Sequence, residues 1–237
     1  MVNETDEALG DYTASLSVSE AILSRRSVRA FRNVPVESDV LRNIIHKAAR
    51  APSGTNIQPW RVYVVAGASR GALCERVGRA FDREAGEHDS EVRYYPVRWF
   101  EPYLSRRREL GWSLYGLLGI KKGEREKARA QHRRNFLFFD APQGMIFTLH
   151  RDLKTGSWLD YGMFIQNIML LAREAGLHTC PQAAWADYHR AIREVLPISD
   201  EETVVCGLSI GYADDNAIEN TLVTPRVESG HFTTFLD

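Results

Sequence analysis

The feature that most constrains this sequence is a long apolar segment that ends at Gly176. Residues 157–176 are predicted to form one helix, because Ser157 and Asp160 have the spacing of a capping box and glycine is a common C-terminal signal. The apolar side chains fall on nearly every side of this helix rather than on one stripe. The helix must therefore be buried all round, either inside the monomer or against a partner chain. Its apolar residues are Leu159, Met163, Phe164, Ile165, Ile168, Met169, Leu170, Leu171 and Ala172.

The other predicted elements are shorter and are separated by turn residues. Strands are predicted at 61–65, 145–149 and 203–212. Residues 69–135 are rich in helix, with interruptions near 94–102 and 116–123. Further helices are predicted at 19–24 with Ser19 as the cap, from the cap Ser38 to Pro52, and from the cap Asp187 to Pro197.

This order of elements favours a single α+β domain. Three or four strands among six or seven helices fit an α+β sandwich better than a doubly wound α/β fold, and no repeat or linker divides the chain. Residues 1–17 read as an acidic tail in front of one domain at 18–237. The last stretch, 213–237, has few core residues and is not expected to pack alone.

The composition is that of a globular protein. The chain has 30 Lys and Arg against 31 Asp and Glu, and 44% of its residues are hydrophobic. No apolar run approaches the roughly 20 residues that span a bilayer. The first 20 residues carry five acids and no base, unlike a signal peptide. We therefore expect a cytoplasmic protein with no membrane partner.

The cysteines and the absent motifs remove several classes of protein. Cys74, Cys180 and Cys206 are far apart and form no C-x-x-C pair, which disfavours a zinc ribbon, a thioredoxin-like site and a disulfide scaffold. H-E-x-x-H, G-x-S-x-G and the glycine-rich phosphate-binding motifs are also absent. We expect no metal site. Cys180 is either a redox thiol or inert, and the lack of a partner cysteine favours an inert thiol.

Positive charge is concentrated in residues 93–134, which hold twelve Lys or Arg and four Asp or Glu. Because the net charge of the whole chain is −1, the remainder is acidic and would repel a nucleic acid. We therefore expect no nucleic-acid partner. The basic stretch is either a solvated helical face or a surface that steers a small anion, such as a pyridine-nucleotide phosphate or a carboxylated substrate.

Four short segments have the residue types of a ligand site, and the first is residues 25–31. It places Arg25, Arg26, Ser27 and Arg29 within five positions. Guanidinium groups bind phosphate bidentately, and a serine hydroxyl adds another donor. The segment is either a phosphate site or an ordinary basic surface cluster.

The second segment is the loop at residues 51–60, between a helix and a strand. Ser53, Thr55, Asn56 and Gln58 offer both donors and acceptors, which suits the edge of a planar heteroaromatic ring. The alternative is an ordinary turn with capping side chains. Trp60 is expected in the core.

The third and fourth segments lie in the second half of the chain. In residues 178–185, small side chains after Pro181 would let main-chain N–H groups approach a flat ligand. The alternative for this segment is a connection or an edge strand. The fourth segment combines Gly211-Tyr212 with Arg226 of the tail, and Arg226 matters only if the tail returns to the site.

Taken in this order, the four segments resemble the nitroreductase family of flavoproteins. The motifs are R-R-S-V-R-x-F, then A-P-S-G-x-N-x-Q-P-W about 25 residues later, then the Pro181 segment, then G-Y and a terminal Arg. The resemblance extends from Ile22 to Arg226. Residues 95–120 look like the subgroup of nitrobenzoate- and dinitroaniline-type reductases.

The resemblance implies a homodimer that binds one FMN in each of two interface sites. It also implies an α/β/α sandwich with a mostly antiparallel central sheet, completed by the partner's C-terminal extension. Some FMN contacts must then come from the opposite subunit. The implied FMN-binding residues are Arg25, Arg26, Ser27, Arg29, Pro52, Ser53, Asn56, Gln58, Pro181, Gln182, Ala183, Ala184, Gly211 and Arg226. The expected substrate contacts are Thr55, Trp99 and Tyr103.

The implied activity is the reduction of nitroaromatic compounds by NADH or NADPH in a ping-pong mechanism. The flavin would carry the hydride, so no catalytic side chain is expected. The alternatives within the same fold are a reductive dehalogenase, an ene-reductase and a flavin-cleaving enzyme. A non-catalytic flavin-binding protein is the alternative from a different class.

Overall fold

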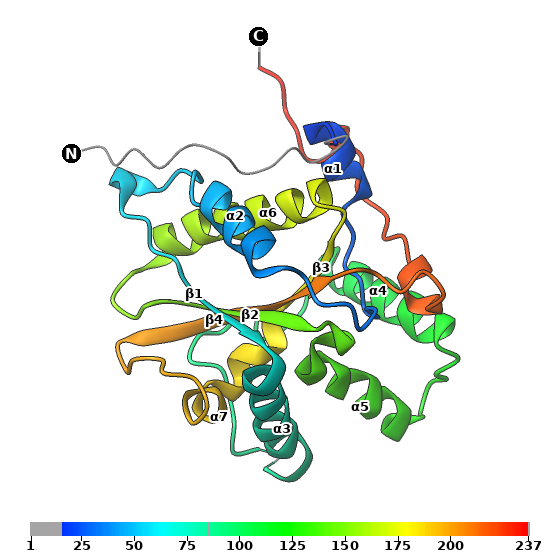
Figure 1. Cartoon of the computed structure of the whole chain (residues 1–237). Helices are drawn as coiled ribbons and strands as arrows, with labels where there is room; N and C mark the ends of the chain where they lie inside the picture. Colours follow the sequence, from blue (N-terminus) through cyan, green and yellow to red (C-terminus); the bar gives the residue numbers. More distant parts are fainter. Residues whose placement is uncertain (1–15, 85, 237) are drawn as a thin grey trace, which may run out of the picture.

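The computed structural model describes residues 16–84 and 86–236, which form a β-sheet between two layers of helices (Figure 1). The strands have the order β1-β2-β4-β3, and each neighbouring pair is antiparallel. The predicted α+β sandwich is confirmed. The strands are β1 (Arg61–Ala66), β2 (Gln143–His150), β3 (His178–Gln182) and β4 (Glu202–Gly211).

Helices cover both faces of the sheet. Helices α2 and α6 lie on one face, and α3 and α7 lie on the other (Figure 1). The α-helices are α1 (Val18–Ser24), α2 (Ser38–Ala48), α3 (Gly67–Arg83), α4 (Tyr103–Leu117), α5 (Arg125–Arg133), α6 (Thr155–Glu174) and α7 (His189–Arg193). The 3-10 helices are η1 (Gly54–Asn56), η2 (Arg134–Asp140), η3 (Ala183–Tyr188), η4 (Ile218–Thr221) and η5 (Ser229–His231).

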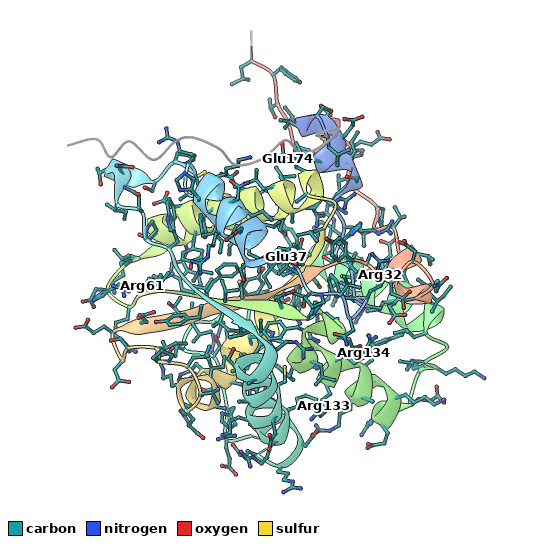
Figure 2. The ribbon with its side chains drawn as sticks, viewed as in Figure 1. Arg32, Glu37, Arg61, Arg133, Arg134 and Glu174 are labelled. Atoms are coloured by element: carbon teal, nitrogen blue, oxygen red, sulfur yellow. The ribbon has the colours of Figure 1, made fainter. Side chains whose placement is uncertain are left out.

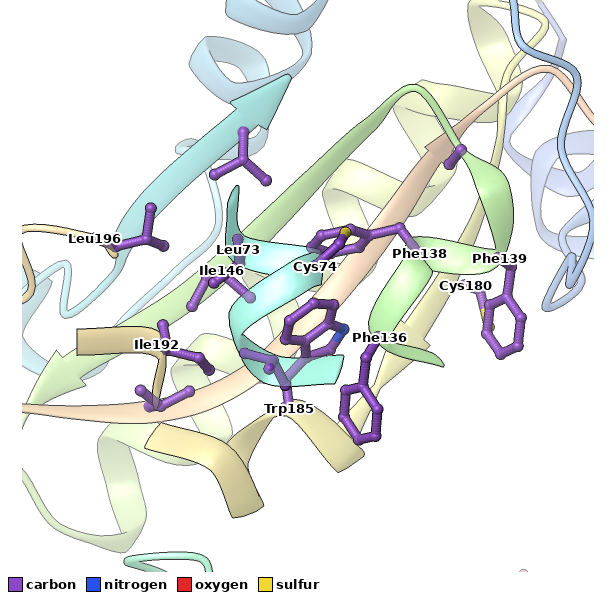
Figure 3. Close-up of a cluster of buried hydrophobic side chains, with 14 of the residues drawn as sticks. Leu73, Cys74, Phe136, Phe138, Phe139, Ile146, Cys180, Trp185, Ile192 and Leu196 are labelled. Atoms are coloured by element: carbon purple, nitrogen blue, oxygen red, sulfur yellow. The ribbon is translucent and has the colours of Figure 1, made fainter. Parts of the chain in front are cut away.

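Two apolar clusters, one on each face of the sheet, hold the layers together. On the α6 face, Phe164 packs with Phe147 of β2. On the opposite face, Trp185 stacks on Phe138 with the ring centroids 4.4 Å apart (Figure 3). A Cβ at Gly207 would lie 2.3 Å from the Trp185 ring, so the indole can lie on β4 only because this position is glycine.

The apolar segment at 157–176 is helix α6, which is buried toward the sheet, α1 and α2. Tyr161 and Phe164 are fully enclosed, whereas Leu159 is 71% exposed and Gly162 is also exposed. Burial inside a single chain therefore does not account for the whole circumference of this helix. Burial against a partner chain, the second option given by the sequence, stays a prediction for the open side.

Several predicted helix caps are wrong by one or two residues. Helix α1 is capped by Ser17 rather than Ser19, because the Ser17 hydroxyl accepts from the Glu20 N–H at 3.3 Å and the Glu20 carboxylate accepts from the Ser17 N–H at 2.7 Å. Ser38 is already the first residue of α2, and Glu37 precedes it without a side-chain cap. A serine one residue away from the boundary has the same local signature as the true cap.

The other two predicted caps lie inside helices. Helix α6 begins at Thr155, so Ser157 and Asp160 follow its start. The Asp160 carboxylate instead accepts a hydrogen bond from the Gly54 N–H at 3.1 Å and holds the loop before β1. Asp187 lies within η3, and α7 begins at His189.

The predicted strands are confirmed with boundaries that differ by at most two residues. The segment at 178–185 is an edge strand followed by a 3-10 helix. Of the two structural alternatives predicted for it, a connection or an edge strand, the edge strand is observed. Beyond Thr224 every described residue of the tail is exposed, in agreement with the expectation that this stretch cannot pack alone. Of the expected acidic tail at 1–17, residues 1–15 lie outside the described part of the chain.

Candidate functional site

The first predicted segment and Arg226 of the fourth line one cavity, with a volume of about 500 Å³. Arg25, Arg26, Ser27 and Arg29 enter it from the segment after α1, and Arg226 enters it from the tail. One side of helix α4 forms the remaining wall. The structure therefore brings together five of the residues that the family resemblance implies at FMN.

The segment after α1 is held along the outer edge of β3. The Val28 N–H donates to the Thr179 carbonyl at 3.1 Å, and Ser27 forms a parallel bridge with the same residue. The Thr179 hydroxyl oxygen is buried without a partner in the described protein. The first predicted segment thus lies directly beside the third.

The tail returns to this segment through Asn220, a residue that the sequence analysis did not single out. The Asn220 carboxamide accepts from the Arg29 N–H at 2.8 Å and donates to the carbonyls of Ala30 at 2.8 Å and Asp214 at 2.9 Å. Its side chain is only 3% exposed. Asn220 therefore fixes the path of the chain toward Arg226.

A second anchor of the tail is Arg134, which is labelled in Figure 2. Its guanidinium donates to Glu219 at 2.5 Å and to Asp140 at 2.9 Å. Arg134 belongs to the basic stretch at 93–134, so part of that stretch has a structural role. Two other members, Arg129 and Arg133, also bond to α3, through the Phe81 carbonyl and the Asp82 carboxylate.

The arginines of the cavity are not neutralised by the protein. Within residues 16–84 and 86–236, Arg25, Arg26, Arg29 and Arg226 form no ion pair. The Nε of Arg26 is buried and has no hydrogen-bond acceptor there. Burial, together with the nearby Arg226 guanidinium, lowers the pKa of Arg25. A buried charge without a partner is costly, so the cavity favours an anion.

The third segment lines a second, larger cavity of about 1470 Å³. Pro181, Gln182, Ala183 and Ala184 border it from the end of β3. The Gln182 carboxamide is already engaged, because it donates to the Asn135 carbonyl at 2.7 Å and accepts from the Ser209 hydroxyl at 2.7 Å. What residues 181–184 offer a ligand is therefore mainly their backbone.

The loop at 51–60 lines neither of these cavities. The Ser53 hydroxyl accepts from the Gln58 N–H at 3.0 Å, which closes the loop. Thr55, Asn56 and Gln58 have φ angles of +50°, +61° and +47°, a left-handed conformation that L residues rarely adopt. Three such residues in one exposed loop store strain, and strain of this kind gathers at binding sites.

The two halves of the predicted site lie at opposite ends of α6 (Figure 1). Asp160 holds the loop at Gly54, and Arg173 donates to the Ser24 hydroxyl of α1 at 3.2 Å. Thirteen residues of helix separate Asp160 from Arg173, which corresponds to about 20 Å at 1.5 Å per residue. One chain therefore does not bring Ser53 and Asn56 to the arginine cavity.

The remaining predicted residues also lie outside the two cavities. Trp99 packs against Tyr95, and the Arg107 guanidinium lies 4.8 Å from the Trp99 ring. The Arg106 guanidinium lies 5.6 Å from the Tyr103 ring. Gly211 is enclosed, because a Cβ there would lie 3.2 Å from Pro142 and 3.4 Å from Phe31. Its closest contacts are therefore structural ones.

Cys180 lies next to the arginine segment, but its surroundings make it an unreactive thiol. It is a free, buried thiol, and burial raises its pKa to about 11. A thiol with such a pKa stays protonated near neutral pH and is a poor nucleophile. Among the described residues, no cluster of three or more His, Cys, Asp or Glu side chains has the geometry to hold a metal ion. None of the described helices has the length and apolar character needed to cross a membrane.

Comparison with known proteins identifies the class to which this fold and site belong. The model of the Nitroreductase family matches residues 22–212. A 4-nitrobenzoate reductase of Pseudomonas putida is 39% identical over 91% of this chain and 93% of that protein. The chain belongs to the Nitroreductase family.

Solved structures show the same likeness in three dimensions. The crystal structure of the FMN and NADPH-dependent nitroreductase NfnB from Sphigopyxis sp. strain HMH is 37% identical, with a TM-score of 0.90 over 94% of this chain and 100% of that one. The FMN-dependent nitroreductase NfnB from Mycobacterium smegmatis, solved in complex with NADPH, is 30% identical, with a TM-score of 0.88 over 92% of this chain and 97% of that one.

Proposed function

We propose that this chain is an FMN-dependent reductase of nitroaromatic compounds that takes its electrons from NADPH or NADH. The family membership and the relatives named above support the class of reaction. The observation that carries the proposal is the group of unpaired arginines in one cavity, because a phosphate monoester is the anion that such a group binds best.

The residues of the chain fit FMN. Arg25, Arg26, Arg29 and Arg226 would hold its phosphate, since their charges have no ion-pair partner in the described protein, and the Ser27 hydroxyl would add a neutral donor. The backbone of residues 181–184, with small side chains beside it, would lie along the ring. Gly211, which the resemblance implies at the cofactor, packs closely against Phe31 and Pro142.

We propose that two copies of the chain share each site. The loop carrying Pro52, Ser53, Asn56 and Gln58 lies about 20 Å from the arginine cavity of its own chain. The same loop of a second copy would complete the site. The single domain at 18–237 would thus act as a homodimer.

Exposed apolar side chains support this dimer. Leu159 on α6 is 71% exposed, Leu23 on α1 is 85% exposed and Phe235 in the tail is 87% exposed. A partner that covered these side chains would remove their apolar surface from water. Strand β1 is an edge of the sheet in the described chain, so the partner's tail would have a strand to pair with.

The chemistry divides between the cofactor and the protein. FMN, when bound, supplies a flavin that accepts a hydride from the nicotinamide and passes electrons to the second substrate in turn. The arginines bind the cofactor, and the backbone near Ala183 orients the ring. Thr55, Trp99 and Tyr103 would contact the nitroarene. No catalytic side chain is required.

The test is steady-state oxidation of NADPH and NADH by the purified protein loaded with FMN. A nitroarene such as 4-nitrobenzoate should accelerate the oxidation and should itself be reduced to the hydroxylamine level. Anaerobic conditions remove reoxidation by oxygen. A protein that takes up no FMN, or whose reduced flavin is not reoxidised by any nitroarene, would contradict the proposal.

A further inference from the structure

One face of helix α4 lines the arginine cavity, although no residue of this helix was predicted at the phosphate. The lining residues are Arg106, Glu109, Leu110 and Ser113. They occupy positions i, i+3, i+4 and i+7, so they form one continuous stripe of the helix. Arg106 brings a fifth guanidinium to the cavity.

Helix α4 has few contacts that fix it in place. Each of its residues keeps some exposure, and none is buried. Its one side-chain hydrogen-bond partner in the described protein is Glu101, which precedes it in the chain and binds Ser105. No residue of α4 forms an ion pair with any residue of 16–84 or 86–236. Packing and hydrogen bonding alone therefore hold this helix weakly.

When no anion is present, the positive charges at the cavity repel Arg106 and so oppose the packing of α4 against the cavity. Five arginines line the cavity, and Glu109 is the one acidic side chain among the described lining residues. The local excess is thus four positive charges, whereas a phosphate monoester carries about two negative charges. Like charges repel most strongly where solvent is partly excluded. An anion in the cavity removes this repulsion and gives Arg106 a partner.

We infer that Arg106 is a ligand of the cofactor phosphate and that the phosphate thereby docks α4 onto the body of the protein. This inference rests on the proposed function, because it takes FMN as the source of the phosphate. Both Arg106 and its neighbour Arg108 are exposed on this helix, but only Arg106 lines the cavity.

Docking of α4 also positions the aromatic residues in front of it. Tyr103 is the first residue of α4 and packs against Phe100 with ring centroids 5.1 Å apart. Arg107 of α4 lies over the Trp99 ring. Because these contacts tie residues 99–103 to the helix, the phosphate would order the candidate substrate contacts as well as hold the cofactor.

The experiment compares FMN with riboflavin, which has the same ring system and no phosphate. The unaltered chain, Arg106→Ala and the matched control Arg108→Ala are freed of flavin, and both ligands are titrated by flavin fluorescence. Hydrogen exchange of residues 103–117 is then measured with each ligand. Arg106→Ala should bind FMN about 10- to 100-fold more weakly, which is the effect of losing one charged hydrogen bond. Its affinity for riboflavin should equal that of the unaltered chain.

Arg108→Ala should bind FMN like the unaltered chain. FMN should slow exchange in residues 103–117 of the unaltered chain, and riboflavin should not. Equal FMN affinity in Arg106→Ala and Arg108→Ala, or equal protection by the two ligands, would overturn the role of Arg106 while leaving the proposed function intact. Failure of the unaltered chain to bind FMN would overturn the proposed function and the inference together.

Discussion

Arginines in two regions of the protein differ in whether a carboxylate pairs with them. On the α3 and α7 side, Arg76 binds Glu194 at 2.6 Å and Glu84 at 3.0 Å, and Arg193 binds Glu91 at 3.2 Å. In the cavity beside β3, Arg25 and Arg29 have no carboxylate partner in the described chain. The first group is neutralised by the fold, and the second is available to a ligand.

This contrast explains why counting charges along the sequence was not enough. Arg134 and Arg106 both belong to the basic stretch at 93–134, yet Arg134 is paired with Glu219 and Arg106 faces the cavity. A guanidinium with buried carboxylate partners stabilises the fold, whereas an unpaired one in a concave site selects an anion. The predictions below test whether the two groups can be separated by experiment.

The largest effect is expected from removing two cavity arginines. The double variant Arg29→Ala, Arg226→Ala should weaken FMN binding about 1,000-fold, since each charged hydrogen bond to a phosphate contributes about 2 kcal/mol. The free energy of unfolding without cofactor should not fall. Titration of flavin fluorescence measures the first quantity, and chemical denaturation measures the second.

A double variant on α3, Arg79→Ala, Arg83→Ala, removes the same charge from an exposed face and is the matched control. Its FMN affinity should equal that of the unaltered chain. Comparable weakening in both double variants would mean that net charge, rather than the cavity, determines affinity.

The opposite result is expected for a paired arginine. The Arg193 guanidinium binds Glu91 and the carbonyls of Ser199 and Glu202, and its side chain is 16% exposed. Arg193→Ala should lower the free energy of unfolding by about 3 kcal/mol, because it leaves these acceptors with fewer donors. FMN affinity should change by no more than about twofold. A large loss of affinity at unchanged stability would erase the distinction between the two groups.

Asn220→Ala should moderately lower both the free energy of unfolding and the affinity for FMN. The substitution removes two hydrogen bonds that hold the tail to residues 29–30 and a third to the Asp214 carbonyl. We expect a loss of about 2 kcal/mol in unfolding free energy and about tenfold weaker FMN binding, because Arg226 is then less well placed. Unchanged affinity would show that Arg226 does not depend on this anchor.

The smallest effect concerns His178, which lies next to the cavity. Burial and the nearby Arg173 and Arg26 lower its pKa from 6.5 to about 4. Between pH 6.5 and about 4 this histidine is protonated in the unfolded chain but stays neutral in the folded chain. The free energy of unfolding therefore decreases as the pH falls through this window.

His178→Gln should lack that part of the pH dependence, as measured by chemical denaturation at a series of pH values. Bound FMN should shrink the effect in the unaltered chain, since its phosphate offsets the charge of Arg26. A variant with the same pH dependence as the unaltered chain would show that His178 does not titrate as its surroundings indicate.

Much of the fold could be predicted from the sequence, because local patterns determine where elements lie. The apolar stretch around Phe164 predicted α6, and the β-branched run at 61–65 predicted β1. Helix starts were less predictable. Ser157 and Asp160 have the spacing of a capping box, but the tertiary structure uses Asp160 to hold the loop at Gly54. Sequence spacing does not reveal such a distant partner.

The candidate site could be predicted in part. The residue types at 25–29 were compatible with a phosphate site, the family resemblance added Arg226, and the fold places these residues in one cavity. Asn220 and Arg106 were missed, because their roles come from contacts across about 190 residues and from one stripe of a weakly held helix. The basic stretch at 93–134 contains Arg106 but does not distinguish it from its neighbours, and no local signal marks Asn220.

The most direct test of the account is a crystal structure of the protein with FMN bound. We predict two chains per assembly, with the phosphate oxygens of each FMN within about 3 Å of guanidinium nitrogens of Arg25, Arg29 or Arg226. The loop at 52–58 of the other chain should contact the ring. An FMN phosphate bound elsewhere, with the arginines of the cavity still unpaired, would contradict the central claim.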